Sequence, residues 1–315
     1  MKQEVLVTGG AGFIGSHLCH HLVKKKFEVY CLDNFDPYYD PNLKRGNIAD
    51  LMKKDNFHLN EGDILDTKLM KKIIYEKNIE FIFHEAAQPG VRFSIKDPVK
   101  TNNINVVGTL SILQACLNSN VKKIIFGSSS SIYGTIHYLP FDEDHPKNPL
   151  SPYGVSKLAA EHLFRIFYEI YGLDYISLRY FTVFGPRMRP DLAISIFTHN
   201  ALRNSNIEIF GDGNKTRDFT FIDNIIEANM LAMHKGRGEL NIGGNKRVSI
   251  LDLVKKIIKL TNSSSKIIFL DNIKGDANHT FANIEKAKKI LGYIPKINLE
   301  EGLKNFIYHV KSNLK

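Results

Sequence analysis

The amino-acid sequence predicts a doubly wound parallel sheet with helices on both faces, followed by a second, smaller α/β lobe. From residue 4 to about residue 180, short apolar runs alternate with segments of helical periodicity. Runs this apolar are typical of strands buried on both faces, and their alternation with helices indicates parallel βαβ units. After Phe181 a Pro/Gly/Arg-rich stretch at 185–190 and a turn-rich stretch at 211–214 predict the second lobe. The predicted strands contain residues 5–7, 29–32, 81–83, 124–126 and 175–178.

The composition is that of a globular protein, which we expect in the cytoplasm. Of the 315 residues, 43% are hydrophobic and 24% are charged, which excludes a disordered or fibrous chain. We see no secretion signal at the start, and no apolar run reaches the roughly 18 residues that a membrane-spanning helix needs. Cys19, Cys31 and Cys116 lie far apart in apolar segments, so we expect buried, reduced thiols. The net charge of +9 favours anionic ligands.

A glycine-rich loop lies between the first predicted strand and the first predicted helix. It contains Gly9, Gly12 and Gly15. This order is what a dinucleotide fingerprint requires: a tight turn, close approach of the backbone to a pyrophosphate, and amide groups at a helix N-terminus. A plain strand-to-helix turn would not need so many glycines. The loop therefore predicts a Rossmann-like dinucleotide site, which we extend to Phe13 and Ile14.

Two carboxylates follow the next predicted strands. Asp33 ends the second strand, about 20 residues beyond the glycines, where a carboxylate can bind both ribose hydroxyls of NAD and repel the extra phosphate of NADP. The sequence therefore favours NAD as the cofactor. Asp63 and Ile64 close the third strand and can contact the adenine edge, although an ordinary turn explains the same residues almost as well.

Tyr153 and Lys157 lie one turn apart on a predicted helix that runs from Pro152 to about Tyr171. Ser151 suits the N-cap and Pro152 the first helical position. A phenol titrates near pH 10, so general-base work at neutral pH requires a shift of several units. Lys157 and the positive nicotinamide ring can supply it by stabilising the phenolate. Taken alone, the motif also fits a surface helix with an incidental Tyr and Lys.

A serine cluster follows the fourth of these predicted strands and precedes a Tyr-Gly pair. A hydroxyl at the carboxyl end of a parallel strand is where such sheets place catalytic groups. Ser129 can share the substrate hydroxyl with Tyr153 and relay its proton, although a serine cluster by itself is usually a loop. The glycine loop together with Asp33, Ser129, Tyr153 and Lys157, in this order, is a highly specific combination.

With these motifs, residues 4–310 resemble the extended short-chain dehydrogenase/reductase family, and within it the nucleotide-sugar epimerases. The resemblance implies that Tyr153 takes the proton from the sugar O4 while C4 passes a hydride to bound NAD. The 4-keto sugar then turns over and receives the hydride on its other face. Related dehydratases and decarboxylases carry an acidic residue where this chain has Ser130 and Ser131, so we expect the keto sugar simply to be reduced again.

The resemblance also implies how the chain is divided and assembled. We expect an NAD-binding domain over residues 1–181, to which residues 222–243 return, and a nucleotide-sugar-binding lobe over residues 182–315. A homodimer formed by two packed helices is common in this family.

Three stretches resemble UDP-glucuronate 4-epimerases in particular. In that family Thr182 stands where UDP-galactose 4-epimerases have an Asn. A carboxylate on C5 needs a charge-assisted donor and fixed hydroxyls, which Arg189 and Thr182 can provide. Arg189 can alternatively be a hinge residue that holds the two lobes together, and Arg92 is a second candidate for the carboxylate. The expected substrates are UDP-glucuronate and UDP-galacturonate, with UDP-glucose or UDP-N-acetylglucosamine as alternatives. The three stretches are residues 33–40, 86–94 and 181–191.

Further residues are assigned through the same resemblance. Phe210 begins a segment like the family's uridine and diphosphate site, and Arg217 can clamp phosphate with its planar fork. Asp276 lies in a later segment that often carries a phosphate-binding Arg, but this chain has Ile273 at that position. Asn105 matches a cofactor-side Asn in the Asn-x-x-Gly-Thr turn of a long helix. The remaining assignments are Asn34, Ala86 and Ala87 for NAD, and Gln88 and Ser130 for the sugar nucleotide.

Other classes of protein fit the sequence less well. A catalytically idle NAD-binding regulatory protein would lack the Tyr or the Lys of the motif, and both are present. A nucleic-acid module needs basic and aromatic residues clustered on one element, whereas here they are scattered. His17, His20 and His21 share a helix, but no acidic or Cys partner stands at ligand spacing, so we expect no metal.

Overall fold

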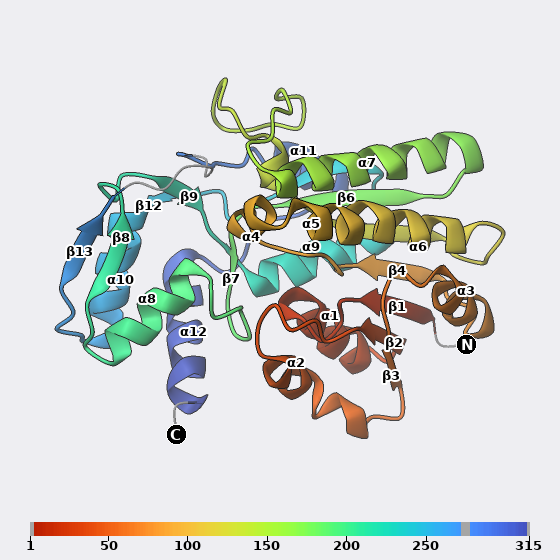
Figure 1. Ribbon diagram of the computed structural model, residues 1–315, viewed down its shortest axis with the longest axis horizontal. Coiled ribbons are helices and arrows are strands. Elements are labelled where there is room, and N and C mark those ends of the chain that lie inside the picture. The colour runs from red at the N-terminus through yellow and green to blue at the C-terminus, as the bar shows by residue number, and fades with distance from the viewer. Residues whose placement is uncertain (1–2, 272–277, 314–315) are drawn as a thin grey trace.

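The computed structural model describes residues 3–271 and 278–313 and is built around a seven-stranded parallel sheet (Figure 1). The strand order is β3-β2-β1-β4-β5-β6-β11, and every neighbouring pair is parallel. The order reverses between β1 and β4, which is the point where such sheets bind ligands. The strands are β1 (Glu4–Thr8), β2 (Glu28–Asp33), β3 (Phe57–Glu61), β4 (Phe81–His84), β5 (Lys123–Ser129), β6 (Tyr175–Tyr180) and β11 (Gly238–Ile242).

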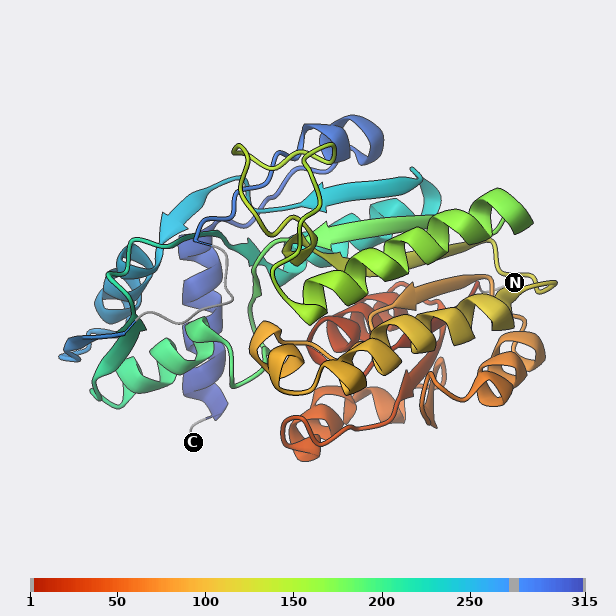
Figure 2. The ribbon, with the colours of Figure 1, turned by 45° about the horizontal axis from the view of Figure 1, so that its top comes forward.

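Helices cover both faces of the sheet, which confirms the predicted doubly wound architecture (Figures 1 and 2). Successive side chains of a strand point to opposite faces. Val5 and Val7 accordingly enter a core closed by α1 and α9, while Leu6 enters a separate core closed by α3, α6 and α7. These helices are α1 (Phe13–Lys24), α3 (Thr67–Glu76), α6 (Gly108–Cys116), α7 (Pro152–Tyr171) and α9 (Ile222–His234).

Helix α7 begins and ends where its sequence signals predict. The Ser151 hydroxyl accepts a hydrogen bond of 3.1 Å from the amide of Gly154, and Pro152 occupies the first turn. At the other end Gly172 adopts φ +71°, the left-handed conformation that terminates many helices. Tyr153 and Lys157 therefore lie in a well-anchored first turn.

Shorter helical elements complete the fold. The helices among them are α2 (Pro41–Ile48), α4 (Val91–Lys96), α5 (Pro98–Asn102) and α11 (Glu285–Leu291). The tighter or wider turns are the 3₁₀ segments η1 (Leu51–Lys53) and η3 (Ser130–Ile132) and the π-helical segment η2 (Asn103–Val107).

The smaller lobe consists of three two-stranded sheets and their helices, and it contains the last helix of the chain (Figure 1). After β10 the chain returns to the main sheet, where β11 pairs with β6, and it then re-enters the smaller lobe at β12. The lobe's elements are β7 (Val183–Phe184), α8 (Ala193–Leu202), β8 (Ile207–Phe210), β9 (Thr216–Asp218), β10 (Thr220–Phe221), β12 (Arg247–Ser249), α10 (Ile250–Thr261), β13 (Ile267–Leu270) and α12 (Leu299–Asn313).

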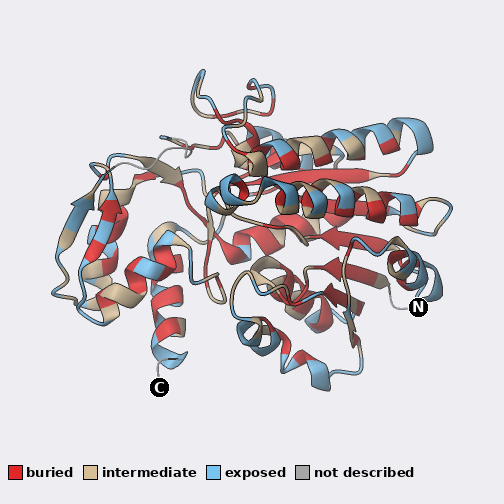
Figure 3. Cartoon of the chain, viewed as in Figure 1, coloured by how far each residue is buried: buried red, intermediate tan, exposed pale blue. Residues whose placement is uncertain are grey.

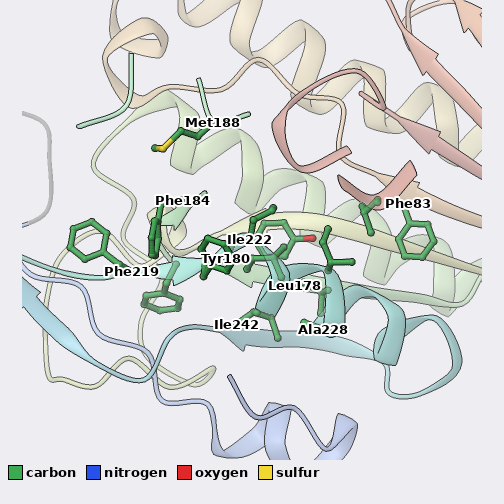
Figure 4. Close-up of a cluster of buried hydrophobic side chains, with 14 of the residues drawn as sticks. Phe83, Leu178, Tyr180, Phe184, Met188, Phe219, Ile222, Ala228 and Ile242 are labelled. Carbon is green, nitrogen blue, oxygen red and sulfur yellow. The ribbon is translucent and has the colours of Figure 1, made fainter. Parts of the chain in front are cut away.

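One hydrophobic core runs from the sheet into the smaller lobe. Tyr180 and Leu178 of β6 lie beside Ile222 of α9, and Phe184 and Phe219 continue the cluster toward the lobe (Figure 4). Burial follows the same pattern, with buried strands and with helices exposed on their outer faces (Figure 3). The two lobes are therefore packed against each other through a shared interior.

The three cysteines are buried and form no disulfide, as predicted. Across residues 3–271 and 278–313, no helix is long and apolar enough to cross a membrane.

Candidate active site

A cleft opens at the carboxyl ends of β1, β2, β4 and β5, where it also receives side chains from α7 and the smaller lobe. It brings together most of the residues that the sequence assigned to the cofactor, and two assigned to the sugar nucleotide. Those that line it are Gly9, Gly12, Phe13, Ile14, Gly15, Asp33, Asn34, Asp63, Ile64, Ala86, Ala87, Gln88, Tyr153, Lys157 and Arg189.

The glycine loop leaves no room for side chains. A Cβ on Gly15 would lie 2.2 Å from the carbonyl oxygen of Gly9. Gly9 itself has φ +68°, and a Cβ there would lie 2.8 Å from the backbone of Ala86. Helix α1 begins directly behind this turn, so its first amide groups face the cleft. The loop fits the pyrophosphate of a dinucleotide.

Asp33 is buried and held by the backbone. Its Oδ2 accepts a hydrogen bond of 3.0 Å from the Ala11 amide, and its Oδ1 accepts one of 2.8 Å from the Phe35 amide. The Lys44 ammonium lies 4.0 Å from Oδ1. Each carboxylate oxygen has a second lone pair, so Asp33 can still accept ribose hydroxyls. Its position at the end of β2 fits NAD.

A second carboxylate lies across the cleft edge. The Asn34 side-chain amide donates a hydrogen bond of 2.8 Å to Asp63, which also accepts 2.9 Å from the Leu65 amide. The loops after β2 and β3 are thus tied together. Asp63 and its neighbour Ile64 are in place to contact one end of an elongated ligand.

Tyr153 lies inside the cleft beside Ser129 and Arg189. Burial raises the pKa of the Tyr153 phenol, whereas the nearby Ser129 hydroxyl and the charge of Arg189 lower it. Ser129 ends β5, and its hydroxyl also accepts a hydrogen bond of 3.1 Å from the Ser131 amide. The phenol and this hydroxyl can therefore share one substrate hydroxyl.

The Lys157 side chain contacts the backbone of β5. Its ammonium donates a hydrogen bond of 2.7 Å to the carbonyl oxygen of Gly127 and lies 4.6 Å from the centre of the Phe126 ring. Burial lowers the pKa of Lys157. The sequence spacing predicts which face of α7 carries Lys157, but only the fold decides which group the flexible ammonium contacts.

Asn105 lies behind the cleft wall and does not line the cleft. Its Oδ1 accepts 2.7 Å from the Gln88 amide, while its Nδ2 donates 3.2 Å to the Gln88 carbonyl oxygen and 2.9 Å to the Ser156 hydroxyl. The expected long helix is interrupted here by the π-helical segment η2. Asn105 therefore orients the loop that carries Gln88.

Arg189 enters the cleft as part of a surface cluster with Asp191 and Tyr38. Its Nε and Nη2 donate hydrogen bonds of 2.9 and 3.2 Å to the two oxygens of Asp191. The Tyr38 hydroxyl donates 3.1 Å to Asp191, and the guanidinium lies 5.5 Å from the Tyr38 ring centre. Thr182, its expected companion, is half-buried between β6 and β7 and does not line the cleft.

Other residues assigned to the sugar nucleotide lie outside the cleft. Arg92 of α4 and Phe210 of β8 meet across the lobes, with the guanidinium 5.2 Å from the ring centre. Arg217 of β9 donates hydrogen bonds to the carbonyl oxygens of Thr216 and Asn278, at 2.9 and 3.1 Å. Ser130 begins η3 and does not line the cleft. Asp276 and Ile273 lie outside the described residues.

Several cleft residues were missed by sequence reasoning. Glu85 and Tyr180 follow or end apolar strands and read as ordinary strand residues. Lys44 comes from α2 and reaches Asp33 only through the fold. Tyr38 falls within the stretch 33–40, but the sequence predicts no individual role for it. Glu85, directly after β4, is the one that the strand-end rule could have found.

The histidines of α1 bind backbone groups. The side chains of His17 and His20 hydrogen-bond the carbonyl oxygens of Pro186 and Asn47, at 2.9 and 3.0 Å. Among the described residues, no group of three or more His, Cys, Asp or Glu side chains is arranged to hold a metal ion.

Comparisons with known proteins agree with this geometry. Residues 6–306 match the family described as GDP-mannose 4,6 dehydratase. The UDP-glucuronate 4-epimerase of Thermodesulfobacterium geofontis is 38% identical over 98% of this chain and 96% of its own length. The UDP-glucuronic acid 4-epimerase of Bacillus cereus, solved in complex with UDP-glucuronic acid and NAD, is 38% identical, with a TM-score of 0.93 over 99% of this chain and 100% of that one.

The UDP-glucose 4-epimerase of Thermotoga maritima, solved with UDP-glucose, is 34% identical, and its TM-score is also 0.93 over 99% of this chain and 100% of that one. Match length and identity of this size identify a common family. The chain belongs to the GDP-mannose 4,6 dehydratase family of extended short-chain dehydrogenases/reductases.

Proposed function

We propose that the protein is an NAD-dependent UDP-sugar 4-epimerase that interconverts UDP-glucuronate and UDP-galacturonate. The observation that carries the proposal is that Tyr153 and Arg189 line the same cleft. A proton acceptor and a cation are thereby placed where a sugar with an anionic C5 substituent can meet both.

The chain's own residues supply binding and proton transfer. Bound NAD would accept the hydride of C4 and return it, and its ring would add positive charge near the phenol. The Tyr153 phenolate takes the proton of O4 and gives it back when the ketone is reduced. Ser129 holds the O4 oxygen during both transfers. The glycine loop and Asp33 orient the cofactor, and Gln88, positioned by Asn105, closes the same side of the cleft.

Arg189 can receive a carboxylate although it is already paired with Asp191. The two bonds to Asp191 use two of the five donors of the guanidinium. The Arg189 side chain is 15% exposed and that of Asp191 is 43% exposed, so Asp191 is the partner on the solvent side. A substrate carboxylate can share the guanidinium or displace Asp191 into water.

The same ion pair supports a second candidate, a 4-epimerase of neutral UDP-sugars such as UDP-glucose. If Asp191 stays in place, the charge of Arg189 is compensated and the cleft offers no excess cation to a uronate. UDP-N-acetylglucosamine is a further possible substrate of this kind. A dehydratase is disfavoured because Ser130 and Ser131 stand where related dehydratases carry an acid.

Substrate turnover distinguishes these candidates. The purified protein is incubated with UDP-glucuronate, UDP-galacturonate, UDP-glucose, UDP-galactose and UDP-N-acetylglucosamine, and product stereochemistry is followed by NMR. We expect the uronates to interconvert faster than the neutral sugars. Faster turnover of UDP-glucose would assign the protein to the neutral-sugar class.

The proposal extends to assembly and location. A homodimer is supported by the outer face of α7, where Ile166 and Ile170 are exposed, and by Val107, which is exposed just before α6. These helices pack side by side (Figure 2). Three buried, reduced cysteines suit the cytoplasm. Residues 1–181 form the cofactor-binding domain and residues 182–315 the sugar-nucleotide lobe, except that residues 222–243 return to the cofactor-binding domain. Sedimentation analysis tests the dimer, because a monomer at micromolar concentration would contradict it.

A further inference from the structure

Glu85 is a carboxyl group inside the cleft that has no part in the reaction as proposed. It follows β4 directly and lines the cleft together with Tyr153 and Lys157. Its Oε1 accepts a hydrogen bond of 2.7 Å from the Tyr180 phenol, and the same phenol oxygen accepts 2.8 Å from Asn229 Nδ2. Tyr180 is packed in the core (Figure 4), so its hydrogen bond fixes the position of the Glu85 carboxylate.

Gly127 brings the Glu85 carboxylate and the Lys157 ammonium to one residue of β5. A Cβ on Gly127 would lie 2.5 Å from Glu85 Oε2, so the carboxylate rests against the bare backbone. The carbonyl oxygen of the same Gly127 accepts the 2.7 Å hydrogen bond from Lys157 Nζ. Both charged groups therefore contact the same glycine in a buried part of the cleft, where charges are weakly screened.

The other charged neighbours of Lys157 are compensated or neutral. Glu161 raises the pKa of Lys157, but its carboxylate is bound by Arg179 at 3.0 and 2.8 Å. Burial and the charge of Lys157 lower the pKa of His84 to about 3, so this imidazole stays neutral. Among the charges that raise the pKa of Lys157 and so oppose the effect of burial, Glu85 has the largest effect.

Glu85 also acts on the proposed base. Its negative charge raises the pKa of the Tyr153 phenol, in opposition to Ser129 and Arg189. Burial raises the pKa of Glu85 itself to about 7, although the hydrogen bond from Tyr180 and the charge of Lys157 lower it. The carboxylate is therefore charged mainly above that pH.

We propose that Glu85 is a positioning residue that keeps Lys157 protonated and thereby sets the pH range in which Tyr153 can exchange a proton with substrate. The inference rests on the proposed function, because it assumes that Tyr153 is the base. Ionised Glu85 stabilises the ammonium and opposes the phenolate, so it shifts both titrations toward higher pH.

The substitution Glu85→Gln tests this, because it keeps the shape and an acceptor for Tyr180 while removing the charge. The pKa values of Lys157 and Tyr153 should both fall. Both limbs of the pH profile of kcat/KM should then move to lower pH by about one unit, the lower end of what a nearby charge does. Tyrosinate absorbance of the holoenzyme, measured as a difference against Tyr153→Phe, should move in the same direction.

Two further variants complete the experiment. Glu143→Gln is the matched control, because Glu143 is also buried and accepts a backbone hydrogen bond of 2.8 Å from Asn241, but lies outside the cleft. In this variant both limbs of the pH profile should stay where they are in the wild type. Glu85→Asp withdraws the charge by one methylene and should give a smaller shift of the same sign. It decides the question if Glu85→Gln does not fold.

An unmoved pH profile and an unmoved tyrosinate titration, with turnover reduced equally at every pH, would make Glu85 purely structural and overturn the inference. A shift to higher pH would do the same. Failure of the proposed function is distinguishable, because then Tyr153→Phe would itself retain turnover.

Discussion

The cofactor side and the sugar-nucleotide side of the cleft are held in different ways. On the cofactor side, Asp33 and the glycine loop are fixed by backbone amides at the ends of neighbouring strands. On the other side, Arg189 is held by the side chains of Asp191 and Tyr38, and the Arg92 guanidinium lies 5.2 Å from the centre of the Phe210 ring. Contacts to backbone amides of the sheet stay the same with or without a ligand, whereas side chains in a cluster can change partners when a ligand binds. The difference indicates a preformed cofactor site and an adjustable sugar site.

The largest effect should come from the cofactor side, at the base. Tyr153→Phe deletes the proton acceptor and little contact area, so turnover should fall by roughly 10²–10⁴-fold. NAD content and UDP binding should stay nearly intact, as measured by direct titration. Ser129→Ala should reduce turnover less, because water can replace part of its relay. Near-normal turnover of the Phe variant would remove Tyr153 from the mechanism.

The next effect concerns the choice of cofactor. Because Asp33 is buried and meets the 2′-phosphate with like charge, NAD should bind at least about 100-fold more tightly than NADP. Lys44, 4.0 Å away, weakens this discrimination without abolishing it. Isothermal titration of wild type and Asp33→Asn measures both affinities. Equal affinities in wild type would show that the backbone-held carboxylate does not select the cofactor.

Arg189→Ala probes the adjustable side. Loss of a charge-assisted bond should weaken the uronate more than the neutral sugar by roughly 1.5–3 kcal/mol. It can also release pentose by-product, because the Arg keeps the substrate carboxylate from aligning for loss of carbon dioxide. Competition between UDP-glucuronate and UDP-glucose, with product analysis, gives the ratio. Equal losses for both sugars would make Arg189 a hinge residue.

The smallest effect is expected at the contact between the lobes. Arg92→Leu removes the cation from the Phe210 ring but keeps an apolar side chain. An exposed cation–π contact contributes about 0.5–1 kcal/mol, so KM for the UDP-sugar should rise about two- to fivefold. Phe210→Leu should behave alike if the pair acts as a unit, and the double variant should add little. A hundredfold loss would instead mean that Arg92 contacts the substrate directly.

Much of the cofactor side could be predicted from the sequence because its signals are local. Strand periodicity, the glycine spacing, Asp33 at a strand end and the capped helix carrying Tyr153 each depend on a short segment. The parallel sheet then brings consecutive strand ends to one edge. Gly9, Asp33 and Asp63 follow this rule and line the cleft, whereas Ser129, at the end of β5, does not line it.

Contacts between distant segments could not be read in this way. The Lys157 ammonium binds Gly127, 30 residues away, and Asn105 orients Gln88 rather than lining the cleft. Long, flexible side chains choose partners by the packing around them, which sequence spacing does not encode.

By itself, the sequence determined the family, the order of strands and helices, and the identity of the groups at the strand ends, because periodicity and turn chemistry are properties of neighbouring residues. Only the tertiary structure decided that Arg189 is paired with Asp191 and that Glu85 and Lys157 both contact Gly127. Arg189 and Asp191 are close in the sequence, but Glu85, Gly127 and Lys157 are far apart along the chain. The strength of these interactions depends on burial, which exists only once the sheet and the smaller lobe have packed together.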